Sequence, residues 1–196
     1  MLLLDEPMAA LDVAVRPALR QTLRRVLAER TAVVVTHDVL DALLLADRVV
    51  VVEGGAVVEQ GPTGEVLTQP RSRFAAEIAG LNLVSGRWTD DGLVTDDGLR
   101  VVGESAEIGP VAGEPAVAVF PPSAVSVFLT APGGSPRNAV AVTVTSVEPQ
   151  AGHLRVRGGG LSADVTPRSV AELGLAPGVS AVFVVKATEV TVYPRT

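Results

Sequence analysis

The stretch MLLLDEPMAALDV, residues 1–13, decides the fold class of the first part of the chain. A short apolar run, Leu2 to Leu4, ends there in two acids, Asp5 and Glu6. An apolar run that ends in acids is typical of a buried strand that delivers carboxylates to the edge of a sheet. Because carboxylates in that position usually meet a metal ion or a water molecule, the stretch predicts a site as well as a strand.

Strand and helix patterns alternate from this stretch to about residue 80, which predicts an α/β sheet. In chain order we expect a helix over 17–30, a strand over 32–36, a helix after residue 38, a hairpin over 48–61 and two short helices near 64–69 and 72–80. Asp38 can cap the helix that follows it. Arg20, Arg24 and Arg25 are expected on the solvated face of the first helix.

Helical periodicity almost disappears after Leu81. Short apolar segments separated by Gly and Pro follow, with one helical turn at 169–174, and this pattern predicts a small all-β barrel or sandwich. We find no clean internal repeat in this part, only a weak similarity of strand spacing. The expected division is an α/β domain over 1–80, a β-rich connecting segment over 81–134 and a β domain over 135–196.

Composition excludes several classes of protein. The 196 residues carry a net charge of −6 with the acids spread along the chain, so no basic stripe is present to bind nucleic acid. The sequence has no cysteine, which excludes disulfides, thiolate metal sites and a thiol nucleophile. No apolar run approaches the roughly 20 residues of a membrane-spanning helix. We therefore expect a soluble protein without a nucleic-acid partner.

Three short motifs occur in a fixed order in the first 40 residues: LLLDEP at 2–7, AALD at 9–12 and VVVTHD at 33–38. In this order and spacing they resemble the Walker B, D-loop and H-loop motifs of the ATP-binding subunits of ABC transporters. The segment DALLLADRVVVVEGGAVVEQGP at 41–62 resembles the same family. The likeness covers about residues 1–80.

This resemblance implies a role for four residues. Asp5 would help to hold Mg²⁺, through a coordinated water, and Glu6 would orient or deprotonate the water that attacks ATP. His37 would contact the γ-phosphate and take part in catalysis, and Asp12 belongs to the loop that meets the opposite subunit of an ATP-bound dimer. ATP and Mg²⁺ are accordingly the expected cofactors.

Other motifs of that family do not occur in the sequence. They are the phosphate-binding loop GxxxxGK[ST] (Walker A), the Q-loop and the LSGGQ signature, all of which would precede residue 1. We therefore expect that the sequence starts, truncated, inside Walker B. A chain without the phosphate-binding loop is expected to bind ATP poorly and not to hydrolyse it.

A second resemblance concerns the end of the chain. The segment SPRNAVAVTVTSVE from residue 135 and the segment VFVVKATEVTVY up to residue 193 resemble the molybdate-binding Mop or TOBE-type module, over about 135–194. Molybdate is a tetrahedral dianion, which needs a few convergent donors and local positive charge. The resemblance implies an oxyanion site made of Ser135, Arg137, Asn138, Lys186 and Thr188.

Together the two resemblances imply the C-terminal part of the ATP-binding subunit of a molybdate ABC importer. The fold would be an α/β remnant of a P-loop ABC ATPase domain followed by an all-β, OB-like barrel. The implied partners are a second ATPase subunit in a homodimer, an integral membrane permease and, indirectly, a periplasmic or lipoprotein molybdate-binding protein. The implied location is the cytoplasmic face of the cell membrane, as a peripheral protein.

Three alternatives stay open at this point. The chain could come from a sugar, sulfate or iron importer subunit with a related barrel, and molybdate could be replaced by tungstate. It could be a stand-alone, molybdate-binding regulatory module without ATPase activity. It could also be a fragment of a broken gene without a function of its own.

Overall fold

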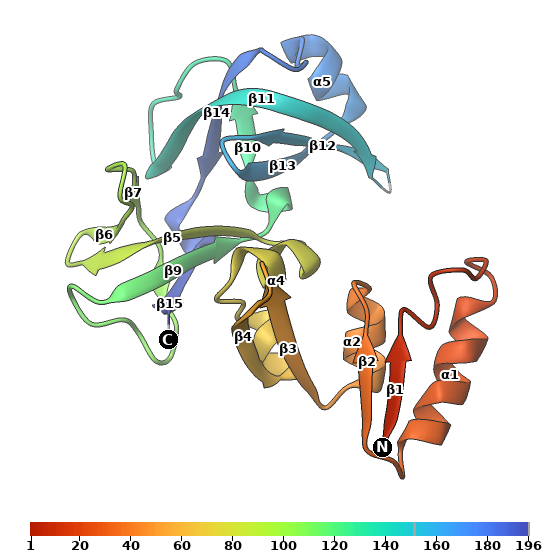
Figure 1. The fold of residues 1–196 in the computed structure, drawn as a ribbon. Helices are drawn as coiled ribbons and strands as arrows, with labels where there is room; N and C mark the ends of the chain where they lie inside the picture. Colours follow the sequence, from red (N-terminus) through yellow and green to blue (C-terminus); the bar gives the residue numbers. More distant parts are fainter. Residues whose placement is uncertain (151, 196) are drawn as a thin grey trace. The chain divides into compact units, whose positions relative to one another are not determined.

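Two compact units make up the chain in the computed structural model, which describes residues 1–150 and 152–195. The first unit is Met1–Ala79 and the second is Gly80–Thr196. Figure 1 shows helices and short sheets in the first unit and mostly strands in the second. None of the helices in these residues is long and apolar enough to cross a bilayer.

The first unit alternates strands and helices, which confirms the α/β pattern expected from the sequence. Its elements are β1 (Leu2–Asp5), α1 (Arg16–Leu27), β2 (Ala32–Val35), α2 (Val39–Leu45), β3 (Arg48–Glu53), β4 (Ala56–Pro62), α3 (Thr63–Thr68) and α4 (Arg73–Ile78). β1 and β2 are parallel, and Asp5 lies opposite Val35 at their carboxyl ends. α2 starts where expected, because the Asp38 side chain accepts a hydrogen bond from the Leu40 N–H at 2.8 Å.

The hairpin of β3 and β4 turns at the expected pair of glycines. Gly54 and Gly55 have φ angles of +57° and +82°. Two consecutive residues in the left-handed region are the requirement of the tight hairpin turn whose twist matches the strands, and glycine adopts that region without steric cost. The turn therefore explains the choice of both residues.

A buried carboxylate joins the hairpin to the last helix of the first unit. Glu59 is only 7% exposed. Its Oε1 accepts a hydrogen bond from the Arg71 N–H at 2.8 Å, and its Oε2 accepts from the Ser72 N–H at 2.9 Å and from the Ser72 hydroxyl at 2.7 Å. The Ser72 hydroxyl in turn accepts from the Ala75 N–H at 3.2 Å and caps α4. Burying a carboxylate is acceptable here because each oxygen is hydrogen-bonded.

The second unit consists mainly of β-strands. Its elements are β5 (Asn82–Thr89), β6 (Gly92–Val94), β7 (Arg100–Val101), β8 (Glu104–Ser105), β9 (Pro115–Phe120), the 3-10 helix η1 (Pro122–Ala124), β10 (Ser126–Phe128), β11 (Asn138–Gln150), β12 (His153–Gly158), β13 (Leu161–Val165), α5 (Pro167–Leu173), β14 (Ser180–Val185), the 3-10 helix η2 (Ala187–Glu189) and β15 (Thr191–Pro194). They form a five-stranded sheet in the order β10-β14-β11-β12-β13 and a six-stranded sheet in the order β7-β6-β5-β9-β15-β8. One apolar core runs through both sheets.

An internal repeat organises the second unit, where the sequence shows only a weak similarity of strand spacing. In the first repeat Asn82 lies opposite Phe120 in the β5–β9 ladder, and in the second repeat Asn138 lies opposite Val185 in the β11–β14 ladder. Each ladder is followed by a 3-10 helix and a short strand, η1 with β10 and η2 with β15. The two segments, FPPSAVSVF and VKATEVTVY, share their pattern but few identities, so the repeat is hard to see in the sequence.

The two repeats exchange their last strands. β10 of the first repeat pairs with β14, with Ser126 opposite Val184, and β15 of the second repeat pairs with β9, with Thr191 opposite Val119. Each repeat therefore completes the sheet of the other. The boundary expected near residue 135 falls between the repeats, inside one compact unit.

Two asparagines at equivalent positions tie the repeats together. The Asn82 side chain accepts a hydrogen bond from the Ser162 N–H at 2.7 Å and donates one to the Ser162 carbonyl at 2.9 Å. The Asn138 side chain accepts from the Val102 N–H at 2.7 Å and donates to the Val102 carbonyl at 2.8 Å. Both asparagines are buried, at 4% and 1% exposure, so each amide satisfies a backbone group of the other repeat.

Replacing Glu59 by Ala is expected to lower the free energy of unfolding of the first unit by roughly 1.5–3 kcal/mol, because buried donors lose a charged acceptor. Amide signals of residues 1–79, followed by NMR in a urea titration, would measure the change for that unit alone. Glu53→Ala, at an exposed carboxylate of the same hairpin, is the control. Equal stability of both variants would show that Glu59 does not hold α4.

Replacing Asn82 or Asn138 by Ala is expected to lower the stability of the second unit by similar amounts, roughly 1–3 kcal/mol each, since each leaves a backbone N–H and a carbonyl without a partner. Trp88, the single tryptophan of the chain, packs against the core of this unit, so its fluorescence follows the unfolding. A loss confined to one of the two variants would contradict the equivalence of the two asparagine contacts.

Candidate functional sites

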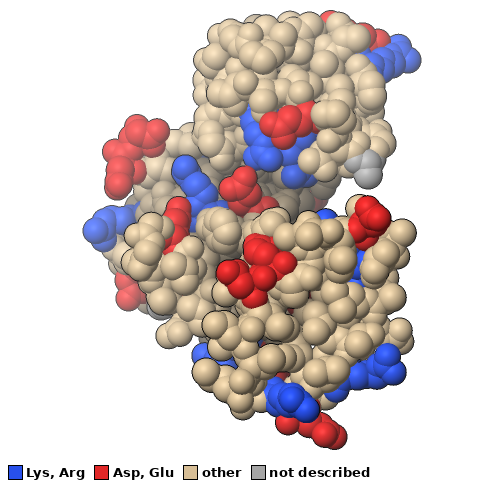
Figure 2. Space-filling model, turned by 45° about the vertical axis from the view of Figure 1, so that its right-hand side comes forward, with Lys and Arg blue, Asp and Glu red and all other residues tan. Residues whose placement is uncertain are grey.

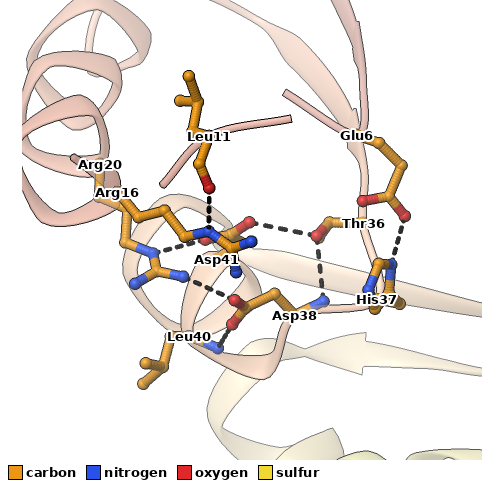
Figure 3. Close-up of polar contacts among 9 residues, drawn as sticks. All are labelled: Glu6, Leu11, Arg16, Arg20, Thr36, His37, Asp38, Leu40 and Asp41. Carbon is orange, nitrogen blue, oxygen red and sulfur yellow. Dashed lines mark hydrogen bonds and ion pairs between the residues drawn. The ribbon is translucent and has the colours of Figure 1, made fainter. Parts of the chain in front are cut away.

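The first candidate site lies at the carboxyl ends of β1 and β2. Because parallel strands end at the same edge of a sheet, the ladder that pairs Asp5 with Val35 brings Glu6 beside the turn that carries His37. The Glu6 N–H donates to the Val35 carbonyl at 2.8 Å, which extends the ladder by one residue. Figure 3 shows the Glu6 carboxylate directed toward the His37 ring.

Glu6 and His37 form the polar contact of this site. The Nδ1 atom of His37 lies 2.7 Å from Glu6 Oε1, and 77% of the histidine side chain is exposed. This hydrogen bond, and secondly the charge of Glu6, raise the pKa of His37 above its ordinary value. Glu6 has a φ of +44°, in the left-handed region that non-glycine residues adopt at a cost of about 1–2 kcal/mol. A strained residue whose side chain is directed at a histidine is typical of a functional site.

Asp5 and Asp12 lie apart from that contact. Both are exposed, and no hydrogen bond or ion pair of the described residues involves either carboxylate. The Asp12 carbonyl accepts from the Val15 N–H at 2.9 Å where the chain enters α1. The structure therefore brings together Glu6 and His37 and leaves the two aspartates free.

The donor set at this edge fits magnesium in part. A single free carboxylate, Asp5, stands at the end of β1, and Mg²⁺ in nucleotide enzymes is commonly held by one or two carboxylates together with phosphates and water. Within residues 1–150 and 152–195, no three His, Asp or Glu side chains gather closely enough to hold a metal by themselves. Asp5 would thus hold the ion only together with nucleotide and water.

Arg20, expected on a solvated face, is instead paired and nearly buried, so that expectation was wrong for this residue. Its side chain is 11% exposed, its Nε donates to Asp41 Oδ1 at 2.6 Å and its Nη2 donates to Asp38 Oδ2 at 2.7 Å. Arg24 and Arg25 are exposed as expected. The pair could not be predicted from the sequence because its partners lie at the cap and in the first turn of α2, and helical periodicity gives no information on which helix α1 meets.

The second candidate site lies at one end of the β11–β14 ladder. Arg137 precedes Asn138 and Lys186 follows Val185, and Asn138 and Val185 are register partners. The register therefore brings both cationic residues to the same end of the ladder. Ser135, Arg137, Lys186 and Thr188 are all exposed, and no hydrogen bond or ion pair of the described part of the chain occupies their side chains.

A pocket of about 350 Å³ adjoins this end of the ladder. Its wall from the second repeat includes Lys186, Glu189 and Pro136. Residues of the first repeat also line the pocket, among them the hydroxyl residues Ser123 and Ser126. These two serines could not be predicted from the sequence, because only the internal repeat brings η1 and β10 to the pocket that contains Lys186.

Asn138 differs from the other residues of the expected oxyanion set. Both ends of its amide are hydrogen-bonded to Val102, as described above, and only 1% of the residue is exposed. Its observed role is to hold the start of β11, next to Arg137, against the first repeat.

Charged side chains of both signs are scattered over the face of the molecule in Figure 2. Blue and red groups are interspersed there on a mostly tan surface. An anion site near Lys186 would need only its own neighbouring cations.

Comparison with known proteins gives the relatives of the chain. The TOBE domain family matches residues 134–192. The molybdenum import ATP-binding protein ModC of Mycobacterium tuberculosis, strain H37Rv, is 47% identical over 203 residues, which cover 98% of this chain and 55% of the relative. The sulfate/thiosulfate import ATP-binding protein CysA 2 of Chromobacterium violaceum is 45% identical over 82 residues, which cover 41% of this chain and 22% of the relative.

Among solved structures, the cytoplasmic molybdate-binding protein ModG, with molybdate bound, is 35% identical over 43% of this chain and 64% of its own, with a TM-score of 0.40. The ModC and TOBE matches confirm the two family resemblances drawn from the sequence. The chain is thus a relative of the ModC molybdenum import ATP-binding proteins along nearly its whole length, spans about half of theirs, and carries a TOBE domain at residues 134–192.

Proposed function

We propose that the chain is the C-terminal part of the ATP-binding subunit of an ABC importer that couples ATP hydrolysis to molybdate uptake. The observation that carries the proposal is the 47% identity to ModC over 98% of the chain, which includes both candidate sites. The match to CysA 2 covers only 41% of this chain. The TOBE domain, at residues 134–192, lies wholly in the second unit. The substrate is therefore argued from the second unit and the ATP chemistry from the first.

In the proposed ATPase, Glu6 is the base that orients or deprotonates the attacking water. His37 holds the Glu6 carboxylate through Nδ1 and presents the rest of its ring to the γ-phosphate, which its exposure allows. Mg²⁺, held by Asp5 together with nucleotide and water, would neutralise charge on the phosphates. Asp12 would face a second subunit in a homodimer. The present residues alone are proposed not to hydrolyse ATP, because nothing in them corresponds to the phosphate-binding loop of the family.

In the proposed oxyanion site, Arg137 offers a planar fork and Lys186 a compact charge. Ser135 and Thr188 add hydroxyl donors, while Asn138 acts indirectly, by holding the backbone next to Arg137. Among residues 1–150 and 152–195 neither cation has a hydrogen-bond or ion-pair partner, so an anion would meet them without breaking an existing ion pair. The partners of the whole subunit would be a membrane permease and, indirectly, an external molybdate-binding protein, which places the subunit at the cytoplasmic face of the membrane.

Glu6→Gln is expected to abolish hydrolysis while ATP binding persists. The assay uses a chimera in which the N-terminal part of the M. tuberculosis ModC protein precedes residue 1. Removing a general base costs roughly 100-fold or more in rate, whereas ATP affinity depends mainly on the phosphate-binding loop. Phosphate release and nucleotide binding would be measured side by side, with Glu29→Gln as a matched control at an exposed position. Hydrolysis by the Glu6→Gln chimera at the parent rate would exclude Glu6 as the base.

The chain is expected to bind molybdate in calorimetry, and Lys186→Ala or Arg137→Ala to weaken binding roughly tenfold to more than a hundredfold. A hydrogen bond to a charged group contributes about 1.5–3 kcal/mol, which corresponds to that range of affinity. Arg168→Ala, which removes an exposed cation from α5, is the control. Tungstate, sulfate and phosphate are titrated in parallel. Tighter binding of sulfate than of molybdate would refute the substrate, and unchanged affinity in both variants would refute the site.

A further inference from the structure

We propose that Arg20 is a positioning residue for His37. It would act through Asp41 and Thr36, which together hold the turn from which the imidazole reaches Glu6. The catalytic consequence rests on the proposed function, since His37 matters for hydrolysis only if the chain is part of an ATPase. The positioning itself rests on contacts within the first unit and can be tested without nucleotide.

Arg20 provides a nearly buried, two-pronged anchor on α1. Its Nε and Nη2 donate to Asp41 Oδ1 and Asp38 Oδ2 at 2.6 and 2.7 Å, and the Asp41 side chain is only 2% exposed. A guanidinium matches two acceptors at once because its donors have a fixed planar geometry, which a lysine ammonium lacks. The anchor therefore fixes α2 against α1 at the end that follows His37.

Hydrogen bonds connect Arg20 and its two aspartates to both residues that flank His37, Thr36 and Asp38. Asp41 uses its second oxygen, Oδ2, to accept from the Thr36 hydroxyl at 3.2 Å, and that hydroxyl accepts from the Asp38 N–H at 3.1 Å. Asp38 uses its second oxygen to cap α2 at Leu40. Figure 3 shows these contacts as a closed set beside the single contact of His37 to Glu6.

The contact between His37 and Glu6 needs such support. Exposed pairs of charged or polar side chains gain little by themselves, because water competes for both groups and two side chains must be held still. His37 is 77% exposed and has no other hydrogen bond among the described residues. The backbone on both sides of the ring must therefore supply the order, and Thr36 and Asp38 are the residues that do so.

The pKa of His37 distinguishes positioning from a direct effect of charge. The charged groups that act on His37 are Glu6 and Asp38, which raise its pKa, and Arg16, which lowers it. Removal of the positive charge of Arg20, which also frees Asp38, would by charge alone raise the pKa of His37. If the His37 ring were no longer held in place, its pKa would fall, because the ring would spend less time in contact with Glu6. The two explanations thus predict opposite signs.

The experiment is an NMR titration of the imidazole nitrogens of the 196-residue chain and three variants: Arg20→Gln, Thr36→Val and the control Arg24→Gln. Thr36→Val removes the relaying hydroxyl without a change of charge and leaves Arg20 paired with both aspartates. Arg24 lies on the same helix and is exposed. The second histidine, His153, lies in the second unit beside Asp164 and serves as an internal reference.

The expected result is a fall of the pKa of His37 toward the ordinary histidine value of about 6.5 in both Arg20→Gln and Thr36→Val. In Arg24→Gln the pKa of His37 is expected to stay as in the parent chain. If Arg20→Gln unfolds the first unit, Thr36→Val alone decides. A pKa of His37 that stays or rises in Thr36→Val, with amide signals of residues 1–79 intact, would overturn the proposal. Absence of ATP hydrolysis in the chimera would refute the proposed function and leave this result unaffected.

Discussion

The parallel ladder between β1 and β2 is the constraint on which the first unit depends. Because Asp5 lies opposite Val35, the chain that continues from each strand arrives at the same edge, and Glu6 and His37 meet there at 2.7 Å. Neither residue is held by burial, since the histidine side chain is 77% exposed. Neighbouring contacts hold both side chains in position. The Glu6 N–H donates to the Val35 carbonyl on one side, and on the other side Asp41 accepts hydrogen bonds from Arg20 and from Thr36. The Glu6 carboxylate is thus anchored through its backbone, and its side chain, 35% exposed, keeps access to water.

Strand register is equally important in the second unit, where the same register occurs in both repeats. The β5–β9 and β11–β14 ladders each begin with an asparagine at an equivalent position. The last strand of each repeat pairs with a strand of the other repeat. The exchange gives the unit one continuous core and places η1 of one repeat beside the pocket that contains Lys186 of the other. An anion site at this end of β11 and β14 would thus depend on both repeats, although its charges come from the second repeat alone.

Local patterns were sufficient to predict the elements of the fold. The apolar run before Asp5, the β-branched run before His37, the glycine pair at 54–55 and the capping Asp38 each gave the expected element, because each depends on residues close in sequence. Contacts between distant residues were not predictable in this way. The ion pair of Arg20 with Asp41 spans 21 residues, and the bonds of Asn82 to Ser162 span 80. The internal repeat escaped notice for a related reason, since register and 3-10 geometry are retained where few identities remain.

Molybdate uptake by living cells tests the central claim most directly. A bacterium that lacks its own ModC protein would receive the chimera that joins the N-terminal part of the M. tuberculosis protein to this chain, or the same chimera with Glu6→Gln. The account predicts that the first restores uptake of radioactive molybdate, which unlabelled tungstate reduces and sulfate does not, and that the second gives none. Uptake of sulfate in place of molybdate, or equal molybdate uptake with both chimeras, would contradict it.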